Sequence, residues 1–349
     1  FSLEELRREF PVFPSPDVEA RVVASMLPAL YLRRPGRSDM EGWIERADRL
    51  FWSLPVGDDR LQIGFHLVAA ACCSGTFAKA ADTIAALTAL ADAGTASPWL
   101  RVVAKAAIGL YQWLTASLDA SARTAADALA LARTAGVQVW DFRSLWCAAA
   151  AHLSRGDAAA AGEALDSIAR NLPITGLFDL FTYDYLVAWR ALLQRDLPLA
   201  RAAQQRSLHT IQGIGIPFAE AQLHLLGLWI DLLRTPCAAT AVRRHLCNVY
   251  RLARGMRSRF VEFAARLGEA YFHLTCGREE HGFRCLALAM RIGREYGYRN
   301  TYAWLDPAMA ALCAKAVAAG IEPGYVLALV RERGLTTDPL PVELEQWPW

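Results

Sequence analysis

The sequence predicts an all-α protein, built as a superhelix of about eight helix pairs. Short polar or glycine-containing junctions recur along the chain at intervals of 38 to 43 residues. The segments between them are rich in Ala and amphipathic with helical spacing, and hydrophobic residues make up 54% of the whole. No run of eighteen apolar residues is free of charges, so we expect no membrane-spanning helix and no membrane partner.

Eight junctions divide the chain in order. They are RPGRSD at Gly36, SGTF at Gly75, SLDA at Leu118, RGDA at Gly156, QRDL at Arg195, RTPC at Thr235, CGRE at Gly277 and AGIE at Gly320. We expect a longer first helix before each junction and a second helix after it, which ends in a Gly/Pro break such as RNLPITG or IQGIGIP. Glycine suits a junction because it tolerates positive φ at a helix C-terminus, and Asp157 or Asp196 can cap the following helix.

The near-constant spacing indicates that the hairpins stack on one another. A single amphipathic hairpin is too small to bury its apolar face alone, so neighbouring hairpins must cover it. We expect the superhelical domain to span residues 1–335 and an interdomain linker to begin in residues 336–349. Spacing alone does not distinguish an open α-solenoid from a closed helical barrel.

One unit is the clearest of the series. Residues 142–173, FRSLWCAAAAHLSRGDAAAAGEALDSIARNLP, resemble a tetratricopeptide repeat in the turn glycine Gly156, the small residues Ala160, Ala161 and Ala164, and the closing Pro173. The resemblance implies a right-handed superhelix of tetratricopeptide-like hairpins. In such stacks the first helix of each pair lines the concave groove.

Three columns of residues share one face of these first helices, because their positions differ by three, four and seven. Thirteen residues before the junction stand Gln62, Lys105, Arg143, Thr182 and Gln222. Ten residues before it stand Ile108, Trp146, Tyr185, Leu225 and Leu267, and six before it stand Gln112, Ala150, Trp189, Trp229 and Tyr271. Together with Asp179 in the aromatic-rich stretch 177–190, the candidate groove residues are Lys105, Arg143, Trp146, Asp179, Thr182, Tyr185, Trp189, Gln222, Trp229 and Tyr271.

Two interpretations of these columns remain open. Aromatic planes beside a few hydrogen-bonding groups suit the binding of sugars, nucleobases or small organic ligands. Alternatively, Trp189, Trp229 and Tyr271 stack on one another and hold adjacent repeats together.

Catalytic and metal-binding signals are missing from the sequence. It contains no GxxxxGK[ST], HExxH, GxSxG or GxGxxG motif, and its seven histidines are spread without metal-ligand spacing. Its eight cysteines form no CxxC pair, which is typical of reduced thiols in a cytoplasmic protein. Net charge is +2, although residues 240–300 hold twelve Arg against five Glu, and no base-reading motif accompanies them. We therefore expect no catalytic residue, metal, cofactor or direct DNA binding in this segment.

Both ends of the chain resemble the sensor superhelix of MalT-like bacterial transcriptional activators. The resemblance rests on LEELRREFPVFPSPDVEARVVASMLPALYLRRPG at the start, and on MAALCAKAVAAGIEPGYVLALVRERGL followed by LEQWPW at the end. It implies an N-terminal signal-transduction ATPase and a C-terminal winged-helix and bacterial transcriptional activator domain outside this segment. It also implies inducer sensing by the superhelix, and Trp347 and Trp349 are then expected to begin the linker to the DNA-binding domain.

Three functions are consistent with these features. A small-molecule sensor predicts one discrete groove around Arg143, Trp146, Thr182, Tyr185, Trp189, Gln222 and Trp229. A protein-protein interaction scaffold without a small-molecule ligand predicts a long open groove. An all-helical barrel enzyme would require carboxylates that converge in a cavity.

Overall fold

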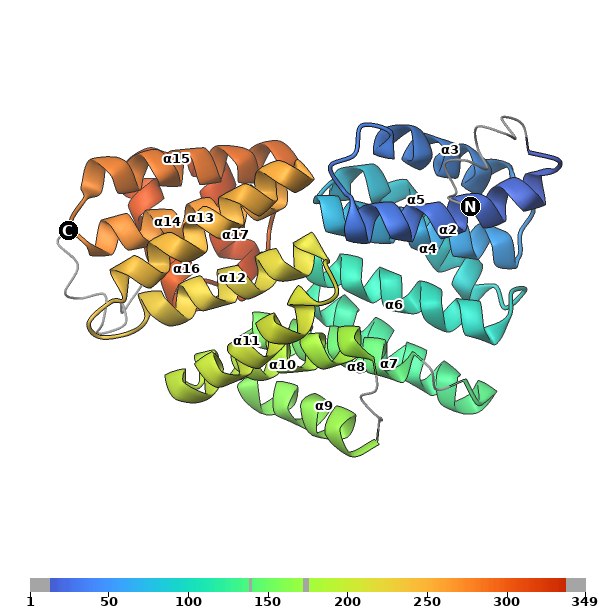
Figure 1. Ribbon diagram of the computed structural model, residues 1–349, viewed down its shortest axis with the longest axis horizontal. Coiled ribbons are helices and arrows are strands. Elements are labelled where there is room, and N and C mark those ends of the chain that lie inside the picture. The colour runs from blue at the N-terminus through green and yellow to red at the C-terminus, as the bar shows by residue number, and fades with distance from the viewer. Residues whose placement is uncertain (1–12, 138–139, 172–175, 337–349) are drawn as a thin grey trace.

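The protein is an all-α superhelix. The computed structural model describes residues 13–137, 140–171 and 176–336, and these contain sixteen α-helices, one short 3-10 helix and no strand. The helices form eight consecutive pairs (Figure 1). The first four pairs are α2 (Pro16–Arg33) with α3 (Met40–Ser53), α4 (Asp58–Ser74) with η1 (Phe77–Ala80) and α5 (Ala81–Asp92), α6 (Pro98–Leu114) with α7 (Leu118–Ala135), and α8 (Asp141–Ser154) with α9 (Ala158–Asn171). The other four are α10 (Leu177–Leu193) with α11 (Leu197–Gln212), α12 (Pro217–Leu232) with α13 (Ala239–Met256), α14 (Arg259–Thr275) with α15 (Glu279–Tyr296), and α16 (Asp306–Ala318) with α17 (Pro323–Arg333).

All eight predicted junctions separate the two helices of a pair, which confirms the repeat assignment. Gly75 and Gly156 end their helices with φ of +80° and +75°, the left-handed conformation that glycine adopts without steric cost. The predicted caps also form: Asp157 accepts a hydrogen bond from the backbone N–H of Ala160, and Asp196 one from that of Leu199, both at 3.0 Å. Local turn and cap chemistry therefore sets the boundaries of the repeats.

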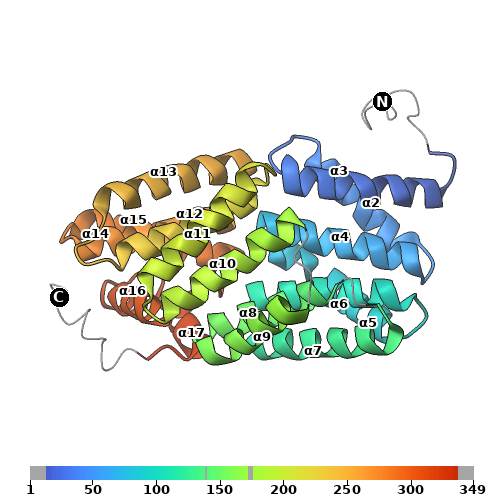
Figure 2. The same cartoon turned by 60° about the horizontal axis from the view of Figure 1, so that its bottom comes forward.

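The first helices of successive pairs pack side by side from α2 to α14, and the superhelix curves so far that later pairs contact the first ones. Helix α12 contacts α2, so the sixth pair meets the first (Figures 1 and 2). At this closure a Cβ on Gly36 would collide with the backbone oxygen of Gly255. Ser258 Oγ donates to the backbone oxygen of Ser74 at 3.3 Å, and the ring of Phe260 lies 5.1 Å from that of Phe77. The superhelix thus encloses its interior.

A buried segment fills part of that interior. Residues 297–305, which we call the connector, join α15 to α16, and Tyr298, Asn300, Tyr302 and Trp304 within it are each at most 2% exposed. Three hydrogen bonds fasten the connector to two first helices, α6 and α10. Asn300 Nδ2 donates to the Trp113 carbonyl at 2.8 Å, the Ala303 N–H donates to Tyr185 Oη at 3.2 Å, and Trp189 Nε1 donates to the Trp304 carbonyl at 3.3 Å. The repeat pattern of the sequence contains no sign of this insertion.

Two further predictions concern the ends of the chain and the membrane. The helices run from Pro16 to Arg333, and the predicted linker lies outside the described residues apart from Thr336. Trp347 and Trp349 are among the residues outside them. Within the described part of the chain, each helix is too short or too polar to cross a bilayer.

Candidate functional site

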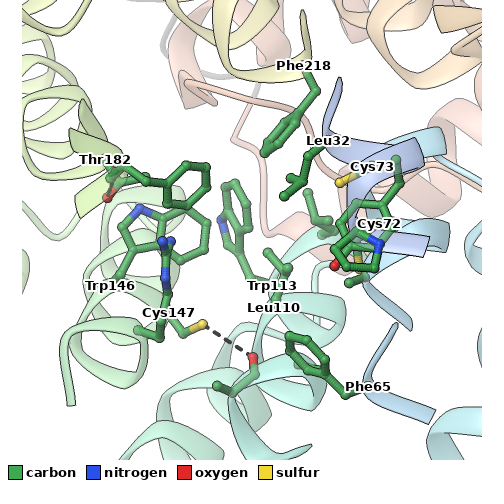
Figure 3. A pocket seen from close by; sticks show the side chains of 18 of the residues that line it. Leu32, Phe65, Cys72, Cys73, Leu110, Trp113, Trp146, Cys147, Thr182 and Phe218 are labelled. Atoms are coloured by element: carbon green, nitrogen blue, oxygen red, sulfur yellow. Dashed lines mark hydrogen bonds between the residues drawn. The ribbon is translucent and has the colours of Figure 1, made fainter. Parts of the chain in front are cut away.

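A cavity of about 350 Å³ lies inside the superhelix, between the first helices and the connector. Its walls come from α2, α4, α6, α8, α10 and α12, and Tyr302 of the connector covers one side. Figure 3 shows Trp146 and Thr182 on one side, Cys72 and Cys73 on the opposite side, and Trp113 and Leu110 between them. Aromatic and aliphatic side chains make up most of this surface, among them Leu32, Phe65, Leu110, Trp113, Phe178 and Phe218.

Four predicted groove residues line this cavity together: Arg143, Trp146, Thr182 and Gln222. They belong to the first two turns of three successive first helices, α8, α10 and α12. Arg143, Thr182 and Gln222 are equivalent members of the polar column counted from the junctions, and stacking brings these equivalent positions to one place. The column therefore converges on the cavity for these three repeats.

Lys105, the member of the polar column on α6, does not contribute to the cavity. Its Nζ donates to Asp92 Oδ1 on α5 at 2.7 Å. Asp179 lies just outside the cavity, where its Oδ1 accepts a hydrogen bond from Arg143 Nη2 at 3.2 Å. Its role there is to orient and partly neutralise the guanidinium.

The other aromatic candidates pack between helices. Tyr185 and Trp189 are at most 1% exposed beneath the connector, and their ring centroids are 6.1 Å apart. Trp229 and Tyr271 make an edge-to-face contact at 5.4 Å. None of these four is among the described residues that line the cavity. For the Trp229–Tyr271 pair the structure shows the stacking between repeats that the sequence left as the alternative.

Arg143 supplies the charge in the cavity wall. Its guanidinium carbon lies 4.2 Å from the ring centroid of Phe178 and 5.6 Å from that of Phe142. Burial lowers the pKa of Arg143 to about 10, because its charge is only partly compensated, mainly by Asp179. Among the described residues that line the cavity there is no Asp, Glu or Lys.

The titratable side chains that line the cavity besides Arg143 are neutral. Tyr31 Oη and His66 Nδ1 are hydrogen-bonded at 3.3 Å, and burial lowers the pKa of His66 to about 4, so its imidazole is uncharged near neutral pH. Burial raises the pKa of the Cys73 and Cys147 thiols to about 12 and that of Cys72 well above its usual value. These thiols therefore remain protonated and behave as small apolar groups.

Trp146 carries an unused hydrogen-bond donor at the cavity. The residue is 7% exposed, and its Nε1–H has no hydrogen-bond partner within the part of the chain that the structure describes. Thr182 differs, because its hydroxyl can donate at 2.9 Å to the carbonyl of Phe178 or Asp179, which leaves an oxygen lone pair as its free function.

Sequence reasoning passed over several residues that line the cavity: Tyr31, Phe65, His66, Phe218 and Tyr302. Phe65 stands ten residues before Gly75, so extending the Trp146 column back by two repeats would have found it. Tyr302 lies in the connector, whose position depends on contacts between distant parts of the chain, and no local pattern marks it.

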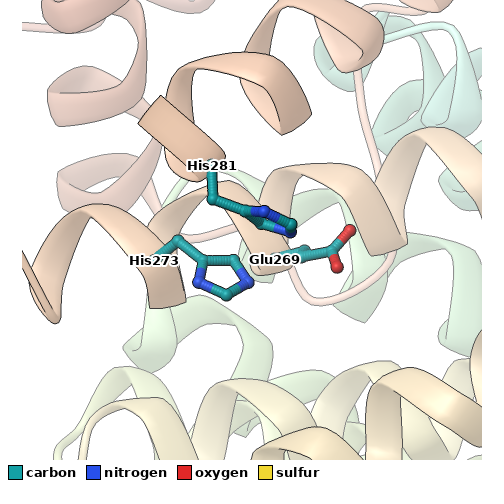
Figure 4. A group of neighbouring side chains, drawn as sticks. All are labelled: Glu269, His273 and His281. Carbon is teal, nitrogen blue, oxygen red and sulfur yellow. The ribbon is translucent and has the colours of Figure 1, made fainter. Parts of the chain in front are cut away.

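A second cluster of polar side chains lies at the other end of the molecule. Glu269 and His273 are one turn apart on α14, and His281 of α15 lies beside them (Figure 4). One possible ligand atom from each residue falls within 4.8 Å of the others. The histidine spacing along the sequence, which shows no metal-ligand pattern, did not predict this group. The carboxylate already accepts hydrogen bonds from Tyr250 and, at 3.0 Å, from Arg266. Burial and the nearby His281 and Arg278 lower the pKa of His273, and this positive surrounding disfavours a divalent cation.

A third polar group is buried between α11, α12 and α13. Arg201 and His245 flank Asp231, which is 1% exposed, with His245 Nε2 at 3.5 Å from Oδ2. Burial acts to raise the pKa of Asp231, but the adjacent His245 and the Arg201 charge together hold it below its usual value. His245 Nδ1 in turn lies 3.0 Å from His224 Nδ1. The group joins three helices and none of its four residues lines the cavity, so we assign it to stability.

No protein-family model matches the sequence, and no curated protein matches it.

Proposed function

We propose that the superhelix is the sensor domain of a MalT-like bacterial transcriptional activator and binds a small, largely apolar molecule in the Arg143–Trp146 cavity. The observation that carries this proposal is the preformed cavity of about 350 Å³, lined by aromatic side chains with a few polar groups. Small-molecule sites typically have this composition and volumes of about 300 to 1,000 Å³. The two chain ends that resemble the activator family supply the biological context.

The connector gives a physical route from the cavity to the C-terminal helix pair. Tyr302 touches the cavity, and the chain continues from it directly into α16 and α17. Arg333 at the end of α17 donates to the backbone oxygen of Ser154, and its guanidinium lies 4.1 Å from the Trp304 ring centroid. An occupant that contacts Tyr302 favours the docked connector and shifts the balance between two arrangements of the chain. The other domains of the same protein are the partners that would read this shift.

The same proposal assigns a regulatory role without catalysis, cofactor or direct DNA contact to this segment, in a cytoplasmic protein. Eight free thiols agree with a reducing compartment. A pure interaction scaffold is less well supported, because the connector occupies part of the interior that a long open groove would need.

A thermal-shift screen of small aromatic and aliphatic compounds tests the proposal. A ligand at one hundred times its Kd stabilises the folded chain by about 2.7 kcal/mol. Ala69 lines the cavity, so Ala69→Phe should fill it and abolish the shift, whereas Ala126→Phe on the exposed face of α7 should leave it unchanged. Equal shifts in both variants would place the ligand elsewhere. Absence of any hit, together with specific capture of a protein partner, would favour the scaffold.

A further inference from the structure

We propose that the ligand is an aromatic monoanion, such as an aromatic carboxylate, whose acidic group binds between the Arg143 guanidinium and the Trp146 indole N–H. This inference rests on the proposed function, since it names the chemical class that the same cavity selects. It follows from the charge of the walls, the free donors and the shape of the remaining surface.

Charge excludes a cationic ligand and favours an anionic one. Arg143 is the ionised group among the described residues that line the cavity, because His66 is held neutral and the thiols are protonated. Asp179, the partner of Arg143, has 38% of its side chain exposed and so is partly solvated. Arg143 keeps 25% of its side chain exposed, so its charge is only partly desolvated, and a ligand anion would complete its pairing as the site closes over it.

Donor geometry favours an acceptor with two oxygens. A guanidinium has five N–H donors in one plane, and the bond to Asp179 involves a single nitrogen, Nη2. Phe178 packs at 4.2 Å and holds that plane in place. Trp146 is one turn along α8 from Arg143, at i+3, so both side chains share one helix face. A carboxylate bound by Arg143 can therefore also accept the indole Nε1–H, which is buried without a partner among the described residues.

The rest of the cavity suits a flat apolar group. Phe65, Leu110, Trp113 and Phe218 provide two phenyl rings, an indole and an aliphatic side chain beyond the two donors. Aromatic rings pack favourably against such side chains in offset or edge-to-face arrangements. The volume of about 350 Å³ accommodates one or two fused rings.

Three matched probes test this class on the whole chain by isothermal titration calorimetry: 1-naphthaleneacetate, its neutral amide 1-naphthaleneacetamide, and the cation 1-naphthylmethylammonium. We expect the acid to bind about tenfold or more tightly than the amide, since charge-assisted hydrogen bonds are roughly twice as strong as neutral ones. The cation should not bind measurably. Arg143→Gln should remove the preference for acid over amide, while Arg284→Gln on the exposed face of α15 should retain it.

Trp146→Phe provides a second variant that preserves the aromatic wall. It should weaken acid binding about fivefold to tenfold by removing one donor, without changing the binding of hydrocarbon-only compounds. Equal affinity for acid and amide in the unchanged protein, or an undiminished preference in Arg143→Gln, would overturn the ligand class. If the acid probe fails while only neutral or cationic compounds bind and lose that binding in Ala69→Phe, the ligand class is also wrong but the sensor proposal stands. If no compound requires the cavity, the proposed function itself fails.

Discussion

Ser154→Ala should loosen the attachment of the connector to the superhelix. Ser154 is fully buried at the end of α8, and its Oγ accepts a hydrogen bond from Trp113 Nε1 at 2.8 Å and a longer one from Asn300 Nδ2 at 3.4 Å. Alanine removes the acceptor and changes little else in volume. The indole N–H of Trp113 is then buried with its partner gone, whereas Asn300 keeps its bond to the Trp113 carbonyl.

The expected cost follows from this count of donors. An unsatisfied buried donor costs about 1 to 3 kcal/mol, and the weaker Asn300 contact adds little, so we expect destabilisation of about 2 kcal/mol. Unfolding entropy of about 2.1 cal/mol/K per residue amounts to roughly 0.7 kcal/mol/K for 349 residues. The Tm should therefore fall by about 3 °C.

Differential scanning calorimetry measures the Tm, and hydrogen exchange with mass spectrometry locates the change. Amides that exchange through global unfolding, those of the buried connector included, should exchange about thirtyfold faster, because each 1.4 kcal/mol is a factor of ten. The matched control is Ser25→Ala, where an exposed hydroxyl donates only to the carbonyl of Arg21 at 2.9 Å. This control should stay within about 0.5 kcal/mol of the unchanged protein. An unchanged Tm and unchanged exchange in Ser154→Ala would refute the idea that this hydroxyl holds the connector.

Three further predictions concern backbone conformation, pH dependence and the buried network. Gly75→Ala should cost about 3 kcal/mol, since φ is +80° and the new Cβ would meet Phe260, whereas Gly136→Ala, at φ +67° with open space, should cost about 1 kcal/mol; urea denaturation measures both. Because burial lowers the pKa of His66 from 6.5 to about 4, the unfolded chain takes up a proton first as pH falls, and stability is lost between pH 6.5 and 4. Between pH 7 and pH 5 this imidazole should cost the unchanged protein about 2 kcal/mol of stability, and His66→Gln should not lose that amount. The urea midpoint of the variant should therefore depend less steeply on pH. Asp231→Asn should cost about 3 kcal/mol in the same assay, because it leaves its guanidinium partner without a buried counter-charge.

Each of these has a contrary outcome. Equal losses of stability in Gly75→Ala and Gly136→Ala would show that the contact with Phe260 adds nothing to the cost. Parallel pH profiles for His66→Gln and the unchanged protein would show that this imidazole titrates alike in the folded and unfolded chain. A neutral Asp231→Asn would indicate that the network is solvated and contributes nothing to stability.

The repeat architecture was predictable because its signals are local. A left-handed glycine at Gly75 or Gly156 and a capping carboxylate at Asp157 or Asp196 each determine the few residues around them. Eight such junctions at near-constant spacing leave stacking as the way to bury the amphipathic faces. The family resemblance, by contrast, stays a prediction.

The candidate site was predictable only in part. Arg143, Thr182 and Gln222 come from equivalent positions, and stacking equivalent positions brings them together at the cavity. Tyr185 and Trp189 share a helix face with them but lie one to two turns nearer the C-terminus of the helix. At that level the connector covers the face. The covering segment is more than one hundred residues away in sequence, so no count along the repeats could distinguish an open face from a covered one.

The connector also changes how this array can fold. In an ordinary stack each repeat contacts only its neighbours, so a chain can gain structure one hairpin at a time. Here Tyr298 donates to the Gly75 carbonyl at 2.9 Å across 223 residues, and Asn300 reaches Trp113 across 187. Contacts at such separation carry a large loop-closure cost, which slows folding and makes it more cooperative. During synthesis the inner face of the early hairpins therefore stays uncovered until the chain has been made as far as residue 305. A chain that stops short of the connector exposes aromatic surface along its interior.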